Sequence, residues 1–468
     1  MATLRCPKTK IALNQSRNKR GTQQSAAPKV ALLHHFMFPD DVVSAQLFHE
    51  LAEDLASQGW EVEALPCNRG CSDESRKFPR KDRHQGVDYK RIWRPSFSQR
   101  SFFGRIANSV WMIGAWSMIA IRPRSERPDV VIIGTDPVFG LAAAIPIRLL
   151  SPSVKIAHWC FDLHPEAAFV TDIVGEQSLF GRVAQRTMRI AYSKCDLIVD
   201  IGSCMRNRLQ RYQHGAKEIE LTPWALKEPA SVVPCDAKLR QELFGDAKLG
   251  LLYSGSFGEA HSYEAILQLA RSLRDCGDIH FCFAARGSRS EALRSAVTTE
   301  DSNISFADLA PLNDLERRLG AADIHIVSLK KDWAGVAVPS KFFGSLSIGR
   351  PVLFSGPADS AIGRWIEEHG LGWVLSEETV SVVDEQLRQL IAPKASFRTL
   401  REVCFRTYRD VFSRQATTSS WDTALRALLA AEDTVIETEK NELQHRGRNN
   451  LASPDNRRFE PGSEHPEV

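Results

Sequence analysis

The sequence predicts an α/β protein built from two parallel-sheet domains that face each other across a cleft. Short, almost wholly apolar segments alternate with helical patterns over residues 29–200, and the alternation restarts at Gly250. Near-continuous apolar strands are typical of a parallel sheet that is covered on both faces. The segment 221–229 separates the two series and contains two prolines. With about 150 residues per domain as a guide, a chain of 468 residues is long enough for two large domains.

The first series begins with a β-α-β pattern. An apolar strand over 29–36 leads into a Pro-containing loop, and from Val42 apolar residues recur at three- and four-residue spacing until Gly59 ends the helix. An alternating strand follows within about 40 residues, which is how a doubly wound sheet starts. The strands expected in this series are 29–36, 61–65, 129–133, 155–161 and 196–200.

The second series has the same character. Its expected strands are 250–254, 279–284, 304–306, 323–327, 351–354 and 372–375, and its expected helices are 263–274, 290–296, 312–319 and 341–348. We therefore expect an N-terminal domain over 29–220, a hinge over 221–229, a C-terminal domain over 230–415 and a last helix over 416–431.

Composition excludes several classes of protein. Hydrophobic residues make up 43% and charged residues 25% of the chain, which is typical of a folded domain and excludes a fully disordered chain. Ten cysteines are too few for a disulfide scaffold of this size, and their unpatterned positions indicate a reducing cytoplasm. Cys67 and Cys71 have no second pair at zinc spacing, so we expect no metal there.

Charge is concentrated at the ends. Residues 1–28 carry six Lys or Arg and no acid, whereas the body of the chain is near neutral, which argues against a nucleic-acid partner. The basic segment lacks the apolar core of a secretory signal. We expect a disordered tail at 1–28, with a weak tether to anionic lipid as the alternative, and a second disordered tail at 432–468.

The segment 106–121 is strongly apolar and has an arginine on either side. Its 16 residues fall short of the ~20 that span a bilayer. Either it is a core helix, or it lies in a membrane interface with Trp111 and Trp116 at headgroup level.

Candidate binding loops follow the strands, because ligands of open parallel sheets bind at the carboxyl ends of the strands. In the C-terminal half, Gly255, Ser256 and Gly258 form a small-residue loop whose backbone amides can approach an anion, although a tight turn would use the same residues. Arg286 follows the next strand and offers a fixed positive charge, unless it is simply an exposed turn residue.

The strongest candidate in the C-terminal half is Pro339-Ser340-Lys341. Proline suits a helix start, where free amides and the positive dipole end can hold a diphosphate. Lys341 would add a full charge, and Ser340 lies beside it. The competing explanation is a capped surface helix with a solvated lysine.

In the N-terminal half, Asp162, His164 and Glu166 lie in one loop after a buried strand. A carboxylate there can orient or deprotonate an acceptor hydroxyl, or stabilise positive charge at a sugar carbon, although capping of the loop is an equally simple role. Asp40 and Asp41 could bind acceptor hydroxyls or cap the helix that starts near Val42.

The chain contains no Asp-x-Asp, the commonest acidic pair for holding a metal on a nucleotide diphosphate. We therefore expect no metal and no other cofactor. Lys341, Arg286 and a helix dipole would have to balance the charge of a leaving group.

These motifs together resemble bacterial family 4 glycosyltransferases, in particular the branch that assembles colanic acid and O-antigen. The resemblance covers residues 29–429 and rests on the following segments: His35-Phe-Met-Phe-Pro-Asp-Asp41, Phe161-Asp-Leu-His-Pro-Glu166, Trp224, Tyr253-Ser-Gly-Ser-Phe-Gly258 and Val338-Pro-Ser-Lys-Phe-Phe343 with Gly349-Arg-Pro351.

The resemblance implies the GT-B fold, with two Rossmann-like domains, and a metal-independent, mostly retaining transfer from a nucleotide sugar to a glycan or polyprenyl-linked acceptor at the cytoplasmic membrane face. Gly255, Ser256, Gly258, Arg286, Ser340 and Lys341 would then bind the donor, Asp40, Asp41 and His164 the acceptor, and Asp162 and Glu166 would be catalytic. Many members carry a Glu pair where this chain has Val336 and Gly344. A nucleotide-sugar epimerase and a non-catalytic scaffold of a polysaccharide assembly complex remain as alternatives.

Overall fold

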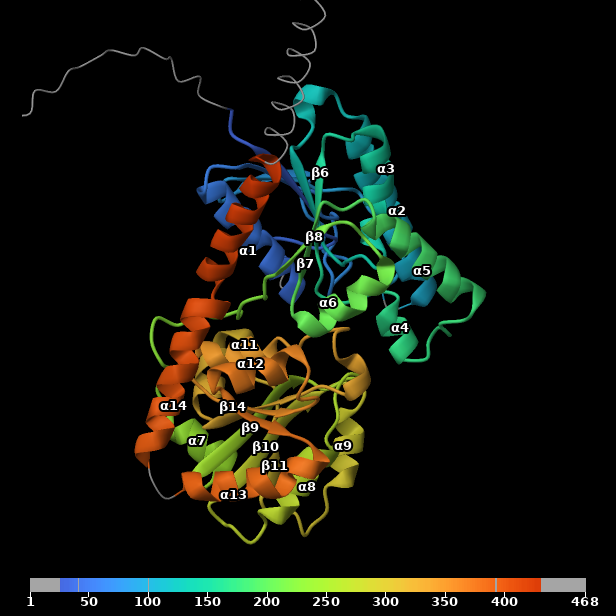
Figure 1. Cartoon of the computed structure of the whole chain (residues 1–468). Helices are drawn as coiled ribbons and strands as arrows, with labels where there is room; N and C mark the ends of the chain where they lie inside the picture. Colours follow the sequence, from blue (N-terminus) through green and yellow to red (C-terminus); the bar gives the residue numbers. More distant parts are fainter. Residues whose placement is uncertain (1–25, 41, 100, 392–393, 431–468) are drawn as a thin grey trace, which may run out of the picture.

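The computed structural model describes residues 26–40, 42–99, 101–391 and 394–430, and it contains two α/β domains stacked end to end (Figure 1). The expected tails at 1–28 and 432–468 lie almost wholly outside the described residues, as does Asp41. The predicted fold class, two parallel-sheet domains, is confirmed.

The N-terminal domain contains an eight-stranded sheet with the strand order β3-β4-β2-β1-β5-β6-β7-β8. Every neighbouring pair is parallel except β3 and β4, which form an antiparallel hairpin at one edge. The strands are β1 (Lys29–Leu33), β2 (Glu61–Ala64), β3 (Lys81–His84), β4 (Val87–Lys90), β5 (Val130–Ile133), β6 (Lys155–Trp159), β7 (Leu197–Asp200) and β8 (Lys217–Glu220). The five predicted strands are present, and β3, β4 and β8 are additional.

Helices cover both faces of this sheet, which explains why its central strands are mostly apolar. They are α1 (Val43–Ser57), α2 (Phe102–Ser117), α3 (Ala144–Leu150), α4 (Glu166–Val170), α5 (Leu179–Tyr192) and α6 (Ser203–Leu209), with short 3-10 turns η1 (Met118–Ile121), η2 (Arg124–Glu126), η3 (Gly140–Ala143) and η4 (Gln210–Tyr212).

The C-terminal domain contains a six-stranded, fully parallel sheet with the order β11-β10-β9-β12-β13-β14. Its strands are β9 (Leu249–Ser256), β10 (Ile279–Arg286), β11 (Ile304–Phe306), β12 (Ile324–Ser328), β13 (Val352–Ser355) and β14 (Gly372–Leu375). All six were predicted to within two residues at each end.

The helices of this domain are α7 (Ala237–Phe244), α8 (Glu264–Ser272), α9 (Ser290–Ala296), α10 (Leu315–Gly320), α11 (Lys341–Ser347), α12 (Ala361–His369), α13 (Val380–Leu390) and α14 (Lys394–Thr407), followed by one π-helical turn, η8 (Tyr408–Phe412). Further 3-10 turns are η5 (Leu312–Asp314), η6 (Lys331–Trp333) and η7 (Glu377–Thr379).

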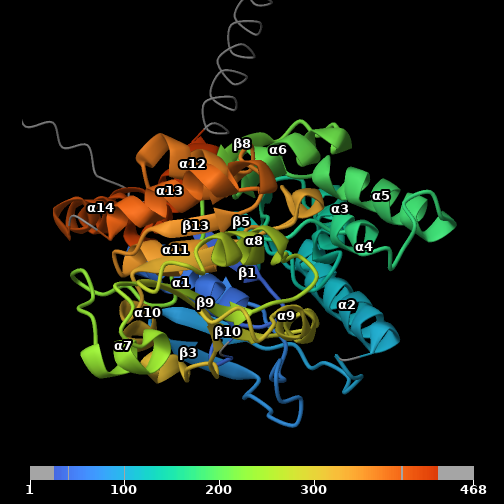
Figure 2. The same ribbon diagram turned by 90° about the horizontal axis from the view of Figure 1, so that it is seen from below.

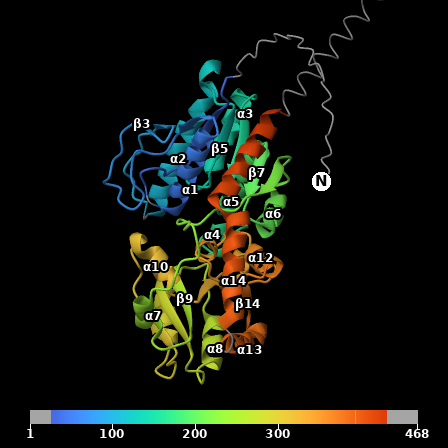
Figure 3. The same ribbon diagram turned by 90° about the vertical axis from the view of Figure 1, so that its left-hand side faces the viewer.

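The two domains are joined twice. The first connection is irregular chain over 221–236, which is longer than the predicted hinge. The second is a helix over 414–430 that runs back along the N-terminal domain (Figure 3). Trp421 of this helix is fully buried with its ring 5.3 Å from that of Trp159, and Arg414 donates to Asp54 of α1 at 2.7 Å.

The apolar segment 106–121 forms most of α2 and all of η1. Met112 and Trp116 lie in the core, so the prediction of a core helix holds for one face, whereas Val110, Trp111 and Met118 are exposed on the other. Among the helices of the described residues, none combines the length and apolarity needed to cross a membrane.

Candidate active site between the two domains

The interdomain cleft is closed at one point by direct backbone contact. The Leu163 amide donates to the Val336 carbonyl at 2.9 Å, and Asp162 pairs with Ala337 in an isolated antiparallel bridge. The loop after β6 therefore lies against the segment that leads into α11. Asp162 of one domain therefore contacts Ala337 of the other, which precedes Lys341 by four residues.

Two glycines allow the domains to approach this closely. A Cβ at Gly335 would lie 2.3 Å from the carbonyl oxygen of Cys204, and a Cβ at Gly202 would lie 2.4 Å from the Cβ of Ala361. Both glycines have positive φ, +75° and +144°, which side chains rarely tolerate. Arg208 adds an interdomain bond by donating to the Ala334 carbonyl at 2.6 Å.

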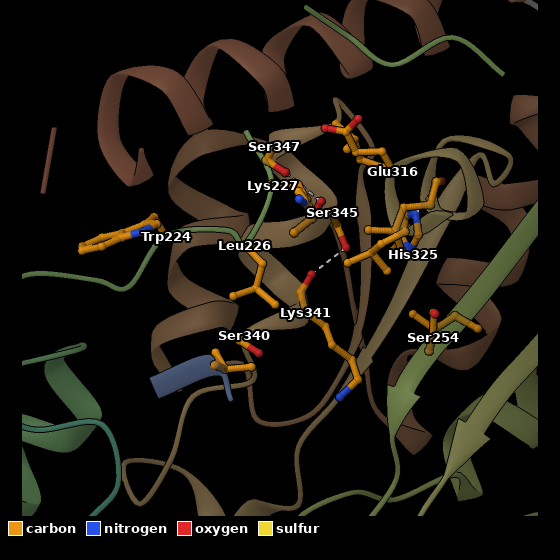
Figure 4. Close-up of a pocket in the computed structure, with 16 residues that line it drawn as sticks. Trp224, Leu226, Lys227, Ser254, Glu316, His325, Ser340, Lys341, Ser345 and Ser347 are labelled. Carbon is orange, nitrogen blue, oxygen red and sulfur yellow. Dashed lines mark hydrogen bonds between the residues drawn. The ribbon is translucent and has the colours of Figure 1, made fainter. Parts of the chain in front are cut away.

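Lys341 is the first residue of α11, and its side chain extends toward the strand that carries Ser254 (Figure 4). Its ammonium lies 5.2 Å from the centre of the Tyr253 ring. Desolvation lowers the pKa of Lys341 to about 8, so the amine is still mostly charged at neutral pH. A half-buried cation of this kind favours an anionic ligand that would restore its lost solvation.

The glycine loop after β9 fits against this lysine. Gly255 has φ +130°, which side chains rarely adopt, and a Cβ there would lie 2.8 Å from Lys341 Cε, so a side chain at this position would displace the end of the lysine. Ser256 is exposed at the strand end, and Gly258 has open space where a side chain would project. Of the three predicted glycine-loop residues, Gly255 contacts the end of Lys341, and Ser256 and Gly258 follow it at the end of β9.

Arg286 lies beside this loop, because β10 pairs with β9 so that Arg286 is opposite Ser256. Its side chain is exposed, and its carbonyl accepts from the Phe257 amide at 2.8 Å. Ser340 is also exposed, immediately before α11. All six predicted donor-binding residues therefore lie at the carboxyl edge of one sheet, on the side that faces the N-terminal domain.

On the N-terminal side, Asp162 is exposed to the cleft yet has protein atoms packed around its carboxyl group. This desolvation raises the pKa of Asp162 to about 6, and the nearby Asp136 carboxylate adds to the rise. Desolvation lowers the pKa of His164 to about 4, so this imidazole is neutral at pH 7.

Sequence reasoning missed the pair formed by His35 and Asp136, whose ring Nδ1 and carboxylate oxygen lie 3.6 Å apart. Desolvation alone would lower the pKa of His35, but Asp136 outweighs it and raises that pKa to about 9. The sequence showed Asp136 in the loop after a buried strand, next to Asp162 in the sheet order, and that position could have identified it.

Two predicted site residues are placed elsewhere. Glu166 is buried and accepts from the Tyr212 hydroxyl at 2.6 Å, with Arg211 at 3.5 Å, and it borders a separate hollow that also includes Asp332 of the C-terminal domain. These contacts give its carboxylate a structural role, and the catalytic role of Glu166 stays a prediction. Asp40 is also buried, and it accepts from the Cys71 amide at 2.6 Å, which makes it a loop-holding residue that neither caps α1 nor is placed to bind an acceptor.

The positions that carry a Glu pair in many relatives have distinct environments here. Val336 is fully buried and its carbonyl makes the interdomain bond to Leu163. Gly344, by contrast, borders the pocket beside Lys341 and has no atom within 4 Å of the place a Cβ would occupy. The replacement at 336 thus contributes to domain contact, and that at 344 leaves the pocket more open.

Comparison with known proteins finds glycosyltransferases. Residues 44–224 match a family model described as "Glycosyl transferase 4-like domain". The chain is 24% identical over 258 residues to "Probable glycosyltransferase WbjE" of Pseudomonas aeruginosa, covering 54% of this chain and 64% of that one. It is 25% identical over 365 residues to "Putative colanic acid biosynthesis glycosyl transferase WcaI" of Escherichia coli (strain K12), covering 74% of this chain and 88% of that one.

Among solved structures, sucrose-phosphate synthase from Thermosynechococcus elongatus superposes with a TM-score of 0.64 at 14% identity, over 86% of this chain and all of that one. That likeness shows a shared GT-B fold. The first relative is matched over less than two thirds of its length. Residues 44–224 are therefore a glycosyl transferase 4-like domain, and the chain has the GT-B fold and is similar to glycosyltransferases of bacterial polysaccharide synthesis.

Proposed function

We propose that the protein transfers a sugar from a nucleotide diphosphate sugar to a glycan or lipid-linked acceptor during synthesis of a cell-surface polysaccharide. The single observation that carries this proposal is that Asp162 of one domain pairs with Ala337, in the segment that leads into Lys341 and α11 of the other domain. A cation suited to a diphosphate and a carboxylate suited to an acceptor hydroxyl are the two charges that such a transfer needs on either side of the reacting sugar.

On the donor side, Lys341 and Arg286 would bind the diphosphate, with Ser256, Gly258 and Ser340 bordering it. As the bond between the sugar carbon and the diphosphate oxygen breaks, negative charge collects on the leaving group. Lys341 would stabilise that charge more than it stabilises the intact donor, which is the condition for accelerating the reaction. Because α11 has only seven residues, we assign this role mainly to the ammonium.

On the acceptor side, Asp162 would orient the attacking hydroxyl and stabilise positive charge at the sugar carbon. With a pKa of about 6, its carboxyl group is mostly ionised at pH 7 and is still basic enough to share a proton. The hydroxyl proton leaves as the new carbon–oxygen bond forms, and either Asp162 or the departing diphosphate can accept it. Neutral His164 borders the same space and is placed to accept or donate a hydrogen bond.

We further propose that the reaction retains anomeric configuration and needs no metal, as in most of the family. In the part of the chain that the structure describes, no three His, Cys, Asp or Glu side chains are grouped so that they could hold an ion. The two cations of the donor side supply charge that a metal supplies elsewhere. We also propose that the protein works at the cytoplasmic membrane face, where a lipid-linked acceptor would be found.

The test is a panel of nucleotide sugars, incubated with the protein and either a short glycan or a polyprenyl diphosphate sugar, with release of nucleoside diphosphate as the readout. We expect release with one donor, unchanged by a chelator, and a product with the donor's anomeric configuration. Donor isomerised in the absence of acceptor would support an epimerase instead. If no nucleotide sugar reacted and no nucleotide raised the thermal stability of the protein, the proposal would be rejected.

A further inference from the structure

The outer surfaces of α2, α3 and α5 expose many large apolar side chains on one side of the N-terminal domain. We call this surface the apolar face, and it consists of Phe103, Val110, Trp111, Met118, Ile121, Leu149, Leu150, Leu179, Phe180, Val183 and Ile190. Isolated exposed apolar residues are ordinary, but a contiguous group of this kind indicates an interaction surface.

The part of the apolar face on α2 is a stripe without charges. Phe103 and Val110 are seven residues apart and therefore share one side of the helix, and they are 82% and 64% exposed. Met118 and Ile121 continue the stripe into η1. The indole nitrogen of Trp111 is held by the Trp93 carbonyl at 2.6 Å, so its ring is fixed at the edge of the stripe.

The part on α5 combines apolar residues with arginines. Leu179, Val183 and Ile190 follow spacings of four and seven, so they also share one side of their helix, and Leu179 is 76% exposed. Three exposed arginines, at positions 182, 186 and 189, lie along the same stretch. Long arginine side chains beside an apolar stripe can keep their guanidinium groups at a water boundary while the stripe is buried.

The stripes are parts of one surface. The helix α3 packs against both α2 and α5, and it adds Leu149 and Leu150 between them. Figure 2, viewed from below, places all three helices along the same side of the domain, away from α1. In Figure 1 they line the right-hand edge, with α4 at the end nearest the C-terminal domain.

The charges on α2, α3 and α5 indicate which partner the apolar face binds. The sequences of α2, α3 and α5 contain no Asp or Glu, whereas they contain five arginines. An apolar stripe bordered by arginines and lacking acids is complementary to a bilayer that contains anionic lipid. A two-fold dimer through this face would instead bring the α5 arginines of both copies toward one interface with no acid from these helices to pair with them.

We propose that the apolar face docks the N-terminal domain onto the surface of an anionic bilayer, with α2 and α5 lying at the level of the headgroups. In its consequence for catalysis this inference rests on the proposed function, because docking would bring the cleft beside α4 close to a lipid-linked acceptor. Arg105 of α2 already lies near enough to His164 for its charge to contribute to the lowered pKa of that imidazole. The acceptor side of the cleft therefore lies near the start of the apolar face.

The test is co-sedimentation of the full chain with vesicles of phosphatidylcholine alone and with about 30 mol % phosphatidylglycerol. We expect binding to the anionic vesicles that weakens with added salt. Val183→Glu should lower the partition coefficient about tenfold, and Val110→Glu with Val183→Glu by about fiftyfold, since each change removes apolar contact and adds a repelled charge. Val382→Glu is the matched control, because Val382 is a helical valine of almost equal exposure, 54% against 56%.

Unchanged binding of the double variant, or an equal loss in the Val382→Glu control, would overturn the inference. It would also be overturned if the protein were a dimer in size-exclusion chromatography with light scattering and the double variant were a monomer. Circular dichroism and thermal unfolding check that the variants are folded. Hydrolysis of a nucleotide sugar without membranes tests the proposed function separately, so vesicle binding without any turnover would reject the function and retain the docking.

Discussion

Replacing Lys341 with methionine removes the charge that we place on the leaving group while keeping the length of the side chain. An ammonium and a phosphate oxygen about 4 Å apart attract by about 4 kcal/mol at an effective dielectric constant of 20. Much of this is offset by desolvation, which already lowers the lysine pKa to about 8, and a net contribution of about 1.5–3 kcal/mol is usual for a charged hydrogen bond. We therefore expect kcat/KM to fall between about 10- and 150-fold.

The assay measures release of nucleoside diphosphate at varied donor concentration. Lys248→Met is the matched control. Lys248 immediately precedes β9, at the end of that strand opposite to Gly255, and its ammonium pairs with Asp278 at the surface. Thermal unfolding of Lys341→Met should be unchanged or higher, since the substitution relieves a desolvated charge. A loss of activity together with preserved stability therefore isolates the electrostatic role.

If Lys341→Met kept kcat/KM within about threefold of the original value, a leaving-group role for this ammonium would be refuted. A loss of the same size in Lys248→Met would refute the reasoning in another way, because it would show that activity depends on the overall charge of the domain.

Further predictions concern pH and domain contact. Because the ionised carboxylate is the active form, kcat/KM should fall below about pH 6, and Asp162→Asn should abolish activity across the whole pH profile; an unshifted profile in that variant would contradict the assignment. Affinity for a nucleoside diphosphate, measured by calorimetry, should weaken as the pH rises through about 8 and Lys341 loses its proton. Because the pKa of His35 is raised in the folded protein, its protonated imidazole stabilises the fold. This contribution is fully present below pH 6.5 and is lost as the pH rises through about 9. The free energy of unfolding in denaturant titrations should therefore drop by about 2 kcal/mol over that range, and Asp136→Asn should remove the drop. Gly335→Ala should lower the unfolding free energy by about 1–3 kcal/mol through strain and clash, and wild-type stability in this variant would show that the domains can separate locally.

The fold could be predicted from the sequence because buried parallel strands leave an unambiguous pattern. The strand Val130–Ile133 is apolar at every position, and it lies in the middle of its sheet. The strand Lys81–His84 was missed for the opposite reason: it is an edge strand with only polar residues, and nothing but its pairing with β4 makes it a strand.

The site could be predicted where the topology alone places a residue. Lys341 and Asp162 each follow from the rule that ligands bind at the carboxyl ends of parallel strands. Glu166 lies only four residues after Asp162, yet one turn of α4 directs it to Tyr212. The short separation from Asp162 in the sequence does not predict the direction of the Glu166 side chain. Its partner Tyr212 is 46 residues away and is known only from the folded structure.

The most direct test of the central claim is a structure of the protein with a bound nucleoside diphosphate. We expect the terminal phosphate to lie within hydrogen-bond distance of Lys341 Nζ, between Gly255 and the start of α11, with the Asp162 carboxylate facing the same space across the cleft. A nucleotide bound elsewhere on the C-terminal domain, with Lys341 still in contact only with Tyr253 and Gly255, would contradict it.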